Sequence, residues 1–143
     1  MVNAVSEAKL HEQICAYIRM QYPKAIFNTD MSGIKLTMGQ AVKAKKLRSS
    51  RGFPDLMIFE PRGHYSAMFL ELKREGEKLT KKNGEWKSSH IEEQSRMMSL
   101  LVGRGFYANF AIGFNDAQMQ IDQYMRLNDL PEIKPESPTG SAG

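Results

Sequence analysis

Residues 54–73 read PDLMIFEPRGHYSAMFLELK, and this stretch decides the fold. Asp55 to Phe59 reads as a strand, and its residues after the Asp are apolar on both faces, the pattern of a strand covered on both sides. Tyr65 to Lys73 has the composition of a second strand, and Pro61-Arg62-Gly63 is typical of a turn between the two. The stretch therefore predicts a central β-hairpin.

Three charged side chains stand at one end of this hairpin: Asp55, Glu71 and Lys73. Because side chains alternate along a strand, Glu71 and Lys73 point to the same face, and the hairpin can bring Asp55 beside them. Two nearby carboxylates repel each other, and a hard divalent cation such as Mg²⁺ neutralises them naturally. Such a cation would polarise a phosphodiester, and Lys73 is then placed to orient or deprotonate the attacking water.

Each half of this pattern is weak evidence alone, because Pro-Asp is a common turn dipeptide and Glu-x-Lys often occurs by chance. The alternative is a surface Asp and an exposed Glu/Lys pair. The apolar neighbours favour the functional interpretation, because unpaired charges among buried residues are costly.

The rest of the chain predicts alternating helices and strands around the hairpin. Ser6 is a suitable N-cap for the first helix, and Tyr22-Pro23 supplies its end. The predicted elements are helices over 6–22, 38–48, 89–102 and 116–127, strands over 25–29 and 107–114, and a polar, lysine-rich loop over 74–87.

Length and composition indicate one compact domain over residues 1–130, followed by a disordered, proline-containing tail over 131–143. The lone Cys15 excludes an internal disulfide framework and a cysteine-rich zinc site, which is typical of a reducing compartment. No apolar run is long enough to span a membrane, and no signal peptide is evident. We therefore expect an intracellular, cytoplasmic protein without a membrane partner.

Positive charge is concentrated in the middle of the chain. Residues 35–104 hold fifteen lysines and arginines against eight acidic residues, a net charge of +7, whereas the flanks hold five against eight, a net charge of −3. This distribution favours a polyanion partner such as DNA, although a solvated lysine-rich surface explains the charge equally well. The candidate phosphate contacts are Lys43, Lys45, Lys46, Arg48, Arg51, Lys81 and Lys82, with Trp86 available to stack on unpaired bases.

Three motifs in this order resemble the VRR-NUC family of the PD-(D/E)xK nuclease superfamily, in its stand-alone, phage-type form. They are Gly52-Phe53-Pro54-Asp55-Leu56, Phe69-Leu70-Glu71-Leu72-Lys73, and Ser89-His90-Ile91-Glu92-Glu93-Gln94 at the start of a helix. The resemblance covers roughly residues 7–126. It implies an α/β fold with a restriction-endonuclease-like core, a mixed sheet of about four strands flanked by helices. The loop over 74–88 departs from the family pattern because it is longer and richer in lysine.

The resemblance also implies a metal site and its reaction. Asp55, Glu71 and the Leu72 carbonyl would bind Mg²⁺ or Mn²⁺, Lys73 would be catalytic, and Gln94 would support the site. Gln94 shares an apolar helix row, so a core amide bonded to backbone is the alternative. His11, His64 and His90 show no metal-site spacing and are interpreted as ordinary polar residues.

The family pattern further implies an acidic residue from the first helix, which could reach the metal through water. Glu12 fits best, because on a 3.6-residue period it falls in a row with Val5, Ala8 and Cys15 that would turn it inward. Glu7 is the rival candidate. In a third interpretation, Glu12 simply pairs with Arg19 on the helix surface.

The expected activity is hydrolysis of DNA phosphodiester bonds by a structure-specific endonuclease. The resemblance favours a homodimer that resolves four-way (Holliday) junctions, since two-fold symmetry matches such a junction. A flap- or end-processing nuclease on linear DNA and a DNA-binding module without catalysis are the alternatives. If the chain is phage-encoded, the host cytoplasm is its expected location.

Overall fold

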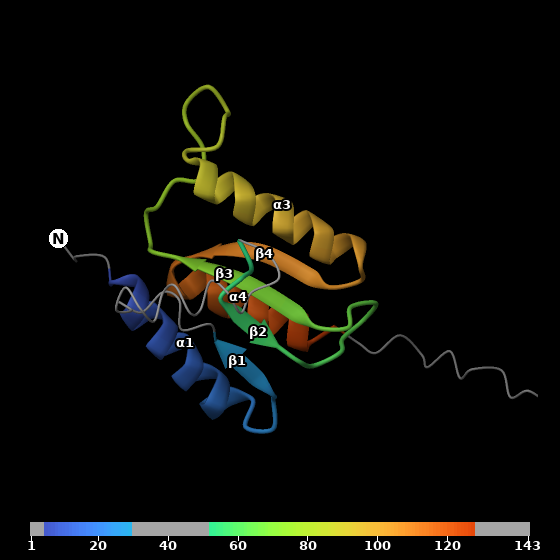
Figure 1. The fold of residues 1–143 in the computed structure, drawn as a ribbon. Helices are drawn as coiled ribbons and strands as arrows, with labels where there is room; N and C mark the ends of the chain where they lie inside the picture. The colour runs from blue at the N-terminus through green and yellow to red at the C-terminus, as the bar shows by residue number, and fades with distance from the viewer. Residues whose placement is uncertain (1–4, 30–51, 128–143) are drawn as a thin grey trace, which may run out of the picture.

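The computed structural model describes residues 5–29 and 52–127, which form an α/β fold with a four-stranded sheet (Figure 1). The sheet order is β1-β2-β3-β4, with the first two pairings antiparallel and the β3–β4 pairing parallel. A mixed sheet flanked by helices is therefore confirmed. The elements are α1 (Glu7–Gln21), β1 (Phe27–Thr29), β2 (Leu56–Ile58), β3 (Met68–Lys73), α3 (Ser89–Gly103), β4 (Tyr107–Ile112) and α4 (Gly113–Met125).

The central hairpin has the predicted partners, but its strands are shorter than the sequence suggested. β2 and β3 pair antiparallel with Leu56 opposite Leu70. Tyr65, the expected start of the second strand, instead forms an isolated bridge with Arg62, and its backbone N–H donates to the Arg62 carbonyl across 2.9 Å. The residues around this bridge therefore belong to the connection rather than to the ladder.

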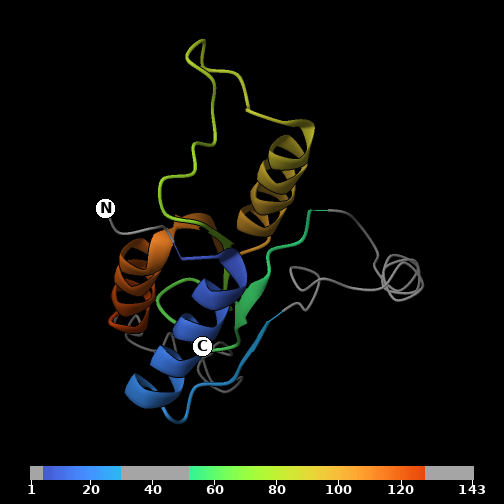
Figure 2. The same ribbon diagram turned by 90° about the vertical axis from the view of Figure 1, so that its left-hand side faces the viewer.

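The helices form two layers around the sheet, with α1 and α4 on one face and α3 on the other (Figures 1 and 2). All six residues of β3 are buried. Leu70 and Leu72 belong to the core that contains α1 and α4, whereas Phe69 packs in a second cluster with Leu101 of α3. Because side chains alternate, Glu71 and Lys73 belong to the α3 face of the same strand.

The α1 helix is fixed at both its start and its end. The Ser6 hydroxyl accepts the Lys9 backbone N–H across 3.2 Å, as predicted for an N-cap. Near the C-terminal end, the hydroxyls of Tyr17 and Tyr22 both donate to Asp122 Oδ1 of α4 across 2.6 Å. Burial, together with the hydrogen bond to Asp122, raises the pKa of both tyrosines, so both hydroxyls remain donors. These bonds fix the position of α1 against α4.

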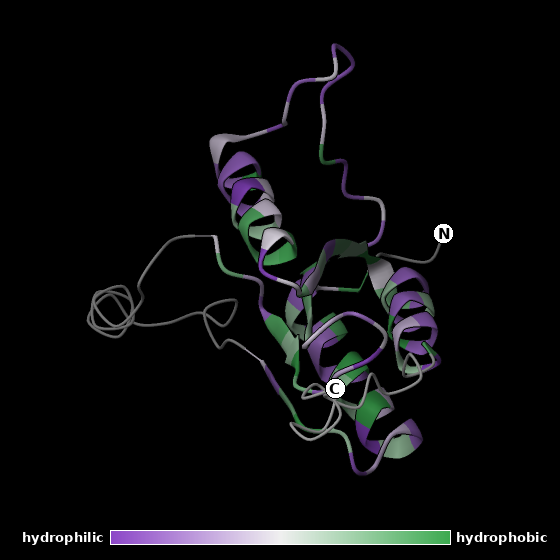
Figure 3. Cartoon of the chain, turned by 90° about the vertical axis from the view of Figure 1, so that its right-hand side faces the viewer, coloured by the Kyte–Doolittle hydropathy of each residue, from purple (hydrophilic) through white to green (hydrophobic). Residues whose placement is uncertain are grey.

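The segment between β3 and α3 forms no helix or strand, as predicted, and projects away from the sheet (Figures 1 and 3). An isolated bridge joins Thr80 to Trp86, and the residues from 80 to 90 are exposed. Figure 3 shows this segment as largely hydrophilic.

The remaining predicted elements are either slightly shifted or outside the described residues. The last strand ends at Ile112 and α4 begins at Gly113, earlier than predicted, because Gly113 adopts φ +83° at the turn. The predicted helix over 38–48 and the tail over 131–143 lie outside the described residues. Within the ranges 5–29 and 52–127, no helix is both long and apolar enough to cross a membrane.

Candidate active site

Asp55 lies immediately before β2 and is only 5% exposed. Its Oδ1 accepts the backbone N–H of Leu72 across 3.0 Å. The carboxylate thereby holds the start of β2 against the end of β3, where the β2–β3 ladder has stopped. This bond fixes one carboxylate oxygen toward the backbone, and Oδ2 is directed toward α1.

Glu71 and Lys73 converge on the same face of β3, as the strand alternation predicted. Each residue is 5% exposed, and Lys73 Nζ lies 3.7 Å from Glu71 Oε1. Gln94 of α3 is buried above them, and its Nε2 donates to Glu71 Oε1 across 2.7 Å. The amide therefore binds the carboxylate rather than backbone, which was the alternative interpretation.

The surroundings of Glu71 disfavour its charged form. Burial raises its pKa first, the neighbouring Asp55 carboxylate raises it further, and Lys73 opposes both, leaving a pKa of about 8. Glu7, at the start of α1, also raises it. A cation at this site would remove the repulsion that these carboxylates now exert on one another.

The inward orientation predicted for Glu12 is wrong. Its side chain is 73% exposed and pairs with Lys9 at 3.4 Å, rather than with Arg19. The buried row of α1 is Leu10, Ile14 and Ile18, and Glu12 does not lie on it. The prediction failed because it followed the small residues Val5, Ala8 and Cys15, whereas the large apolar side chains set the face of a helix that packs on a core.

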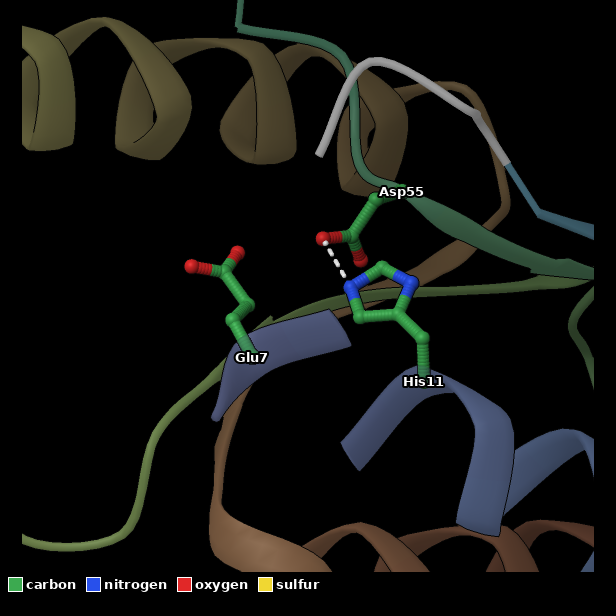
Figure 4. A group of neighbouring side chains, drawn as sticks. All are labelled: Glu7, His11 and Asp55. Atoms are coloured by element: carbon green, nitrogen blue, oxygen red, sulfur yellow. Dashed lines mark ion pairs between the residues drawn. The ribbon is translucent and has the colours of Figure 1, made fainter. Parts of the chain in front are cut away.

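Glu7, the rival candidate, and His11, interpreted from the sequence as an ordinary polar residue, both face the site (Figure 4). They are one turn apart on α1, and His11 Nε2 lies 3.0 Å from Asp55 Oδ2. The potential ligand atoms of Glu7, His11 and Asp55 all lie within 4.8 Å of one another. The spacing from Glu7 and His11 to Ile14 and Ile18 is the signal in the sequence that could have identified both residues.

The surroundings of Glu7 also change the pKa of its carboxyl group. Desolvation raises its pKa, as does the nearby Asp55 carboxylate, while Lys73 and His11 lower it. Glu7 therefore lies within the electrostatic reach of Asp55, Lys73 and His11 together. The structure thus draws residues from α1, the start of β2, β3 and α3 into one polar cluster at the edge of two apolar cores.

Gly52 allows the segment that carries Asp55 to approach α3. Its φ is +78°, and a Cβ atom there would lie 2.8 Å from the carbonyl oxygen of Glu93. No side chain other than the hydrogen of glycine fits this approach. Gly52 therefore sets the distance between the segment that carries Asp55 and the helix that carries Gln94.

The donor set fits a hard divalent cation. Glu7, His11 and Asp55 form a group of potential ligands, and the neighbouring Glu71 is close enough for Asp55 and Glu7 to raise its pKa. Carboxylate oxygens are ligands of the kind that Mg²⁺ and Mn²⁺ bind. In addition, Gln94 Oε1 is buried and has no hydrogen-bond partner among the described residues. A buried amide oxygen in that state needs a donor, and water held by a cation at this cluster would supply one.

The predicted DNA contacts are only partly within the described residues. Lys81 and Lys82 are exposed on the loop between β3 and α3, and Lys81 lies 4.0 Å from Glu85. Trp86 packs against Phe110 with ring centroids 6.3 Å apart while remaining partly exposed. Lys43, Lys45, Lys46, Arg48 and Arg51 lie outside the described residues.

Comparison with known proteins supports the fold. No family model and no curated protein matches the sequence. A solved structure described as "VRR_NUC domain protein" is similar to this chain with a TM-score of 0.66 and 21% sequence identity, over 90% of this chain and 94% of the other. At this identity the likeness shows the fold, and the fold is the α/β core that the sequence motifs implied.

Proposed function

We propose that this protein is a metal-dependent endonuclease that hydrolyses DNA phosphodiester bonds. The observation that carries the proposal is the burial of Asp55, Glu71 and Lys73 together at one end of the sheet. Buried charged groups are costly, and such clusters with a raised carboxyl pKa are concentrated at functional sites. The solved structure with the same fold bears the name of the family that the sequence motifs resemble, which adds independent support.

The cation would be Mg²⁺ or Mn²⁺, held by Asp55, Glu71 and the Leu72 carbonyl. Glu7 takes the role expected for Glu12, because Glu7 faces the cluster and Glu12 faces solvent. When bound, the cation would polarise the phosphodiester and make the attacking water more acidic.

The protein's own residues position the reacting groups. Lys73, next to Glu71, orients the attacking water or accepts its proton. Gln94 fixes the Glu71 carboxylate, and the Leu72 N–H fixes the Asp55 carboxylate, so neither side chain must reorganise when the substrate arrives. The exposed Lys81 and Lys82 would contact phosphates outside the reacting one.

The leading substrate is branched DNA, with a homodimer acting on a four-way junction. The described residues of each chain supply one cluster of this kind, so coordinated cleavage of two strands would require two copies. A two-fold symmetric pair of sites matches the two-fold symmetry of such a junction. Light scattering on a size-exclusion column measures the mass of the protein in solution and so shows directly whether it is a dimer.

The test is a cleavage assay with end-labelled four-way junction, flap, linear duplex and single strand, each with Mg²⁺, Mn²⁺ or EDTA. We expect paired, symmetric nicks in the junction that are absent with EDTA and with Asp55→Ala, while that variant keeps its circular dichroism spectrum. Cleavage confined to flaps or ends would show that linear DNA, rather than a four-way junction, is the substrate. Binding of DNA without cleavage under every condition would contradict the enzymatic proposal and leave a binding module.

A further inference from the structure

We infer that His11 is a nitrogen ligand of the divalent cation and that it makes the site bind transition ions such as Mn²⁺ more tightly than Mg²⁺. The inference deepens the proposed function, on which it rests for the presence of a cation. The sequence motifs gave the site oxygen ligands alone, and His11 adds a ligand of different chemistry.

The geometry around Asp55 carries the inference (Figure 4). His11 Nε2 lies 3.0 Å from Asp55 Oδ2, and the Glu7 carboxylate completes a group within 4.8 Å. Two neighbouring ligands of an octahedral ion, each about 2.1 Å from it, are about 3.0 Å apart. The two atoms form an ion pair when His11 is protonated, and a cation bound by both would take the place of that proton at the same separation.

The position of His11 is set by the fold. Glu7 and His11 are one helical turn apart, on the side of α1 that continues into the buried Ile14 and Ile18. The His11 side chain is 15% exposed, so the protein has already removed most of its hydration. A ring placed in this way loses little freedom on binding an ion, and such preorganisation favours binding.

Ligand chemistry predicts the selectivity. Mg²⁺ prefers oxygen ligands and retains its waters, whereas imidazole nitrogen binds first-row transition ions in the order Mn²⁺, Fe²⁺, Co²⁺, Ni²⁺ of increasing affinity. An all-carboxylate site would distinguish these ions less. With His11 as a ligand, the difference between Mn²⁺ and Mg²⁺ affinity depends on one side chain.

The chain offers two matched controls, because it contains three histidines in total. His64 is exposed in the connection between β2 and β3. His90 is exposed at the start of α3, with its Nε2 3.2 Å from the Gln94 amide nitrogen. His90 is the histidine that competes most directly with His11 for the assignment of a nitrogen signal.

The experiment measures Mn²⁺ bound to the DNA-free protein by electron spin-echo envelope modulation. We expect ¹⁴N coupling from a directly bound imidazole in the wild-type protein, in His64→Gln and in His90→Gln, and its loss in His11→Gln. Calorimetric titration should show Mn²⁺ affinity lowered about tenfold or more in His11→Gln and Mg²⁺ affinity changed less than about threefold.

Three results would overturn the inference: no nitrogen coupling in the wild-type protein, coupling that survives His11→Gln, or an equal loss of Mn²⁺ and Mg²⁺ affinity. The first measurement needs no variant, so it stands even if His11→Gln fails to fold. Nitrogen coupling without DNA cleavage would refute the proposed function alone, whereas cleavage without nitrogen coupling would refute the assignment of His11 alone.

Discussion

Gln94 of α3 donates its amide to Glu71 of β3 across 2.7 Å, with both residues about 95% buried. The bond joins the helix layer on one face of the sheet to a carboxylate near the end of the inner strand β3. Since Gln94 touches a proposed metal ligand and not the substrate, its expected role is to position Glu71.

We predict that Gln94→Leu lowers kcat about tenfold to a hundredfold while KM for DNA changes little, as expected for loss of a residue that orients a metal ligand. The measurement is steady-state cleavage at saturating Mg²⁺. A matching fall in Mg²⁺ affinity would accompany the loss of kcat. If a folded Gln94→Leu protein kept the wild-type kcat, the positioning role of Gln94 would be contradicted.

Lys73→Met tests the catalytic amine directly. Methionine retains much of the buried side-chain volume but removes the group that lies 3.7 Å from Glu71 Oε1. We expect cleavage to fall about a hundredfold or more, the range for loss of a general base, while Mn²⁺ still binds. Single-turnover cleavage and a metal titration on the same sample separate the two effects, and retained cleavage would contradict the assigned role.

Glu7 and Glu12 can be compared on the same helix. Glu7→Gln should weaken Mg²⁺ binding and slow cleavage about tenfold or more, because its carboxylate faces Asp55 and His11. Glu12→Gln removes an exposed carboxylate whose ion-pair partner among the described residues is Lys9, and it should change neither quantity by more than about twofold. If Glu12→Gln instead had the larger effect on Mg²⁺ binding and cleavage, Glu12 rather than Glu7 would be the acidic residue of α1 that acts at the site.

The raised pKa of Glu71 makes the stability of the metal-free protein depend on pH. The folded state holds the proton up to about pH 8, whereas the unfolded carboxyl group loses it near 4.5. The folded state therefore binds more protons between these values, so this contribution to stability is complete below pH 4.5 and is lost as pH rises toward 8.

Thermal melts in EDTA should accordingly show a melting temperature that falls from pH 5 to pH 8.5 more steeply in the wild-type protein than in Glu71→Gln. Added Mg²⁺ should reduce the difference, since metal binding replaces the proton. Identical slopes for the two proteins would show that Glu71 ionises normally in the folded state.

Gly52→Ala should destabilise the fold, and Gly84→Ala is its matched control. Both glycines have positive φ, +78° and +88°, but a Cβ at Gly52 meets the Glu93 backbone at 2.8 Å, whereas a Cβ at Gly84 meets nothing within 4 Å. Both variants should share a backbone cost of about 1 kcal/mol, and Gly52→Ala should lose about 1–3 kcal/mol more from the clash. Urea unfolding measures the difference, and equal losses would mean that the strand and helix can separate without cost.

The sequence predicted the parts of this fold that depend on local pattern. The apolar run before Phe59 and the alternation around Glu71 identified the hairpin and the shared face of Glu71 and Lys73, because strand geometry is short-range. The apolar row of α3 likewise placed Gln94 inside. These features require no knowledge of how distant elements pack.

The contribution of α1 could not be predicted in the same way. The role proposed for His11 depends on its contact with Asp55. Asp55 lies far along the chain and reaches His11 only when α1 packs on the sheet. The rotation of α1 depends on which apolar side chains fill the core, and the small residues beside Glu12 pointed to the wrong face. A helix whose apolar face is weakly defined leaves this rotation to tertiary packing.

The hydrogen bonds from Tyr17 and Tyr22 to Asp122 have a consequence for when the protein can act during its synthesis. They join the first helix that the structure describes to the last one. Until Asp122 has emerged, α1 lacks these two hydrogen bonds and its packing against α4, so the arrangement that turns Glu7 and His11 toward Asp55 is incomplete. A chain whose synthesis has not yet passed Asp122 would thus carry the separate parts of the proposed site without assembling them, and the proposed cleavage of nucleic acid could begin only after α4 has emerged.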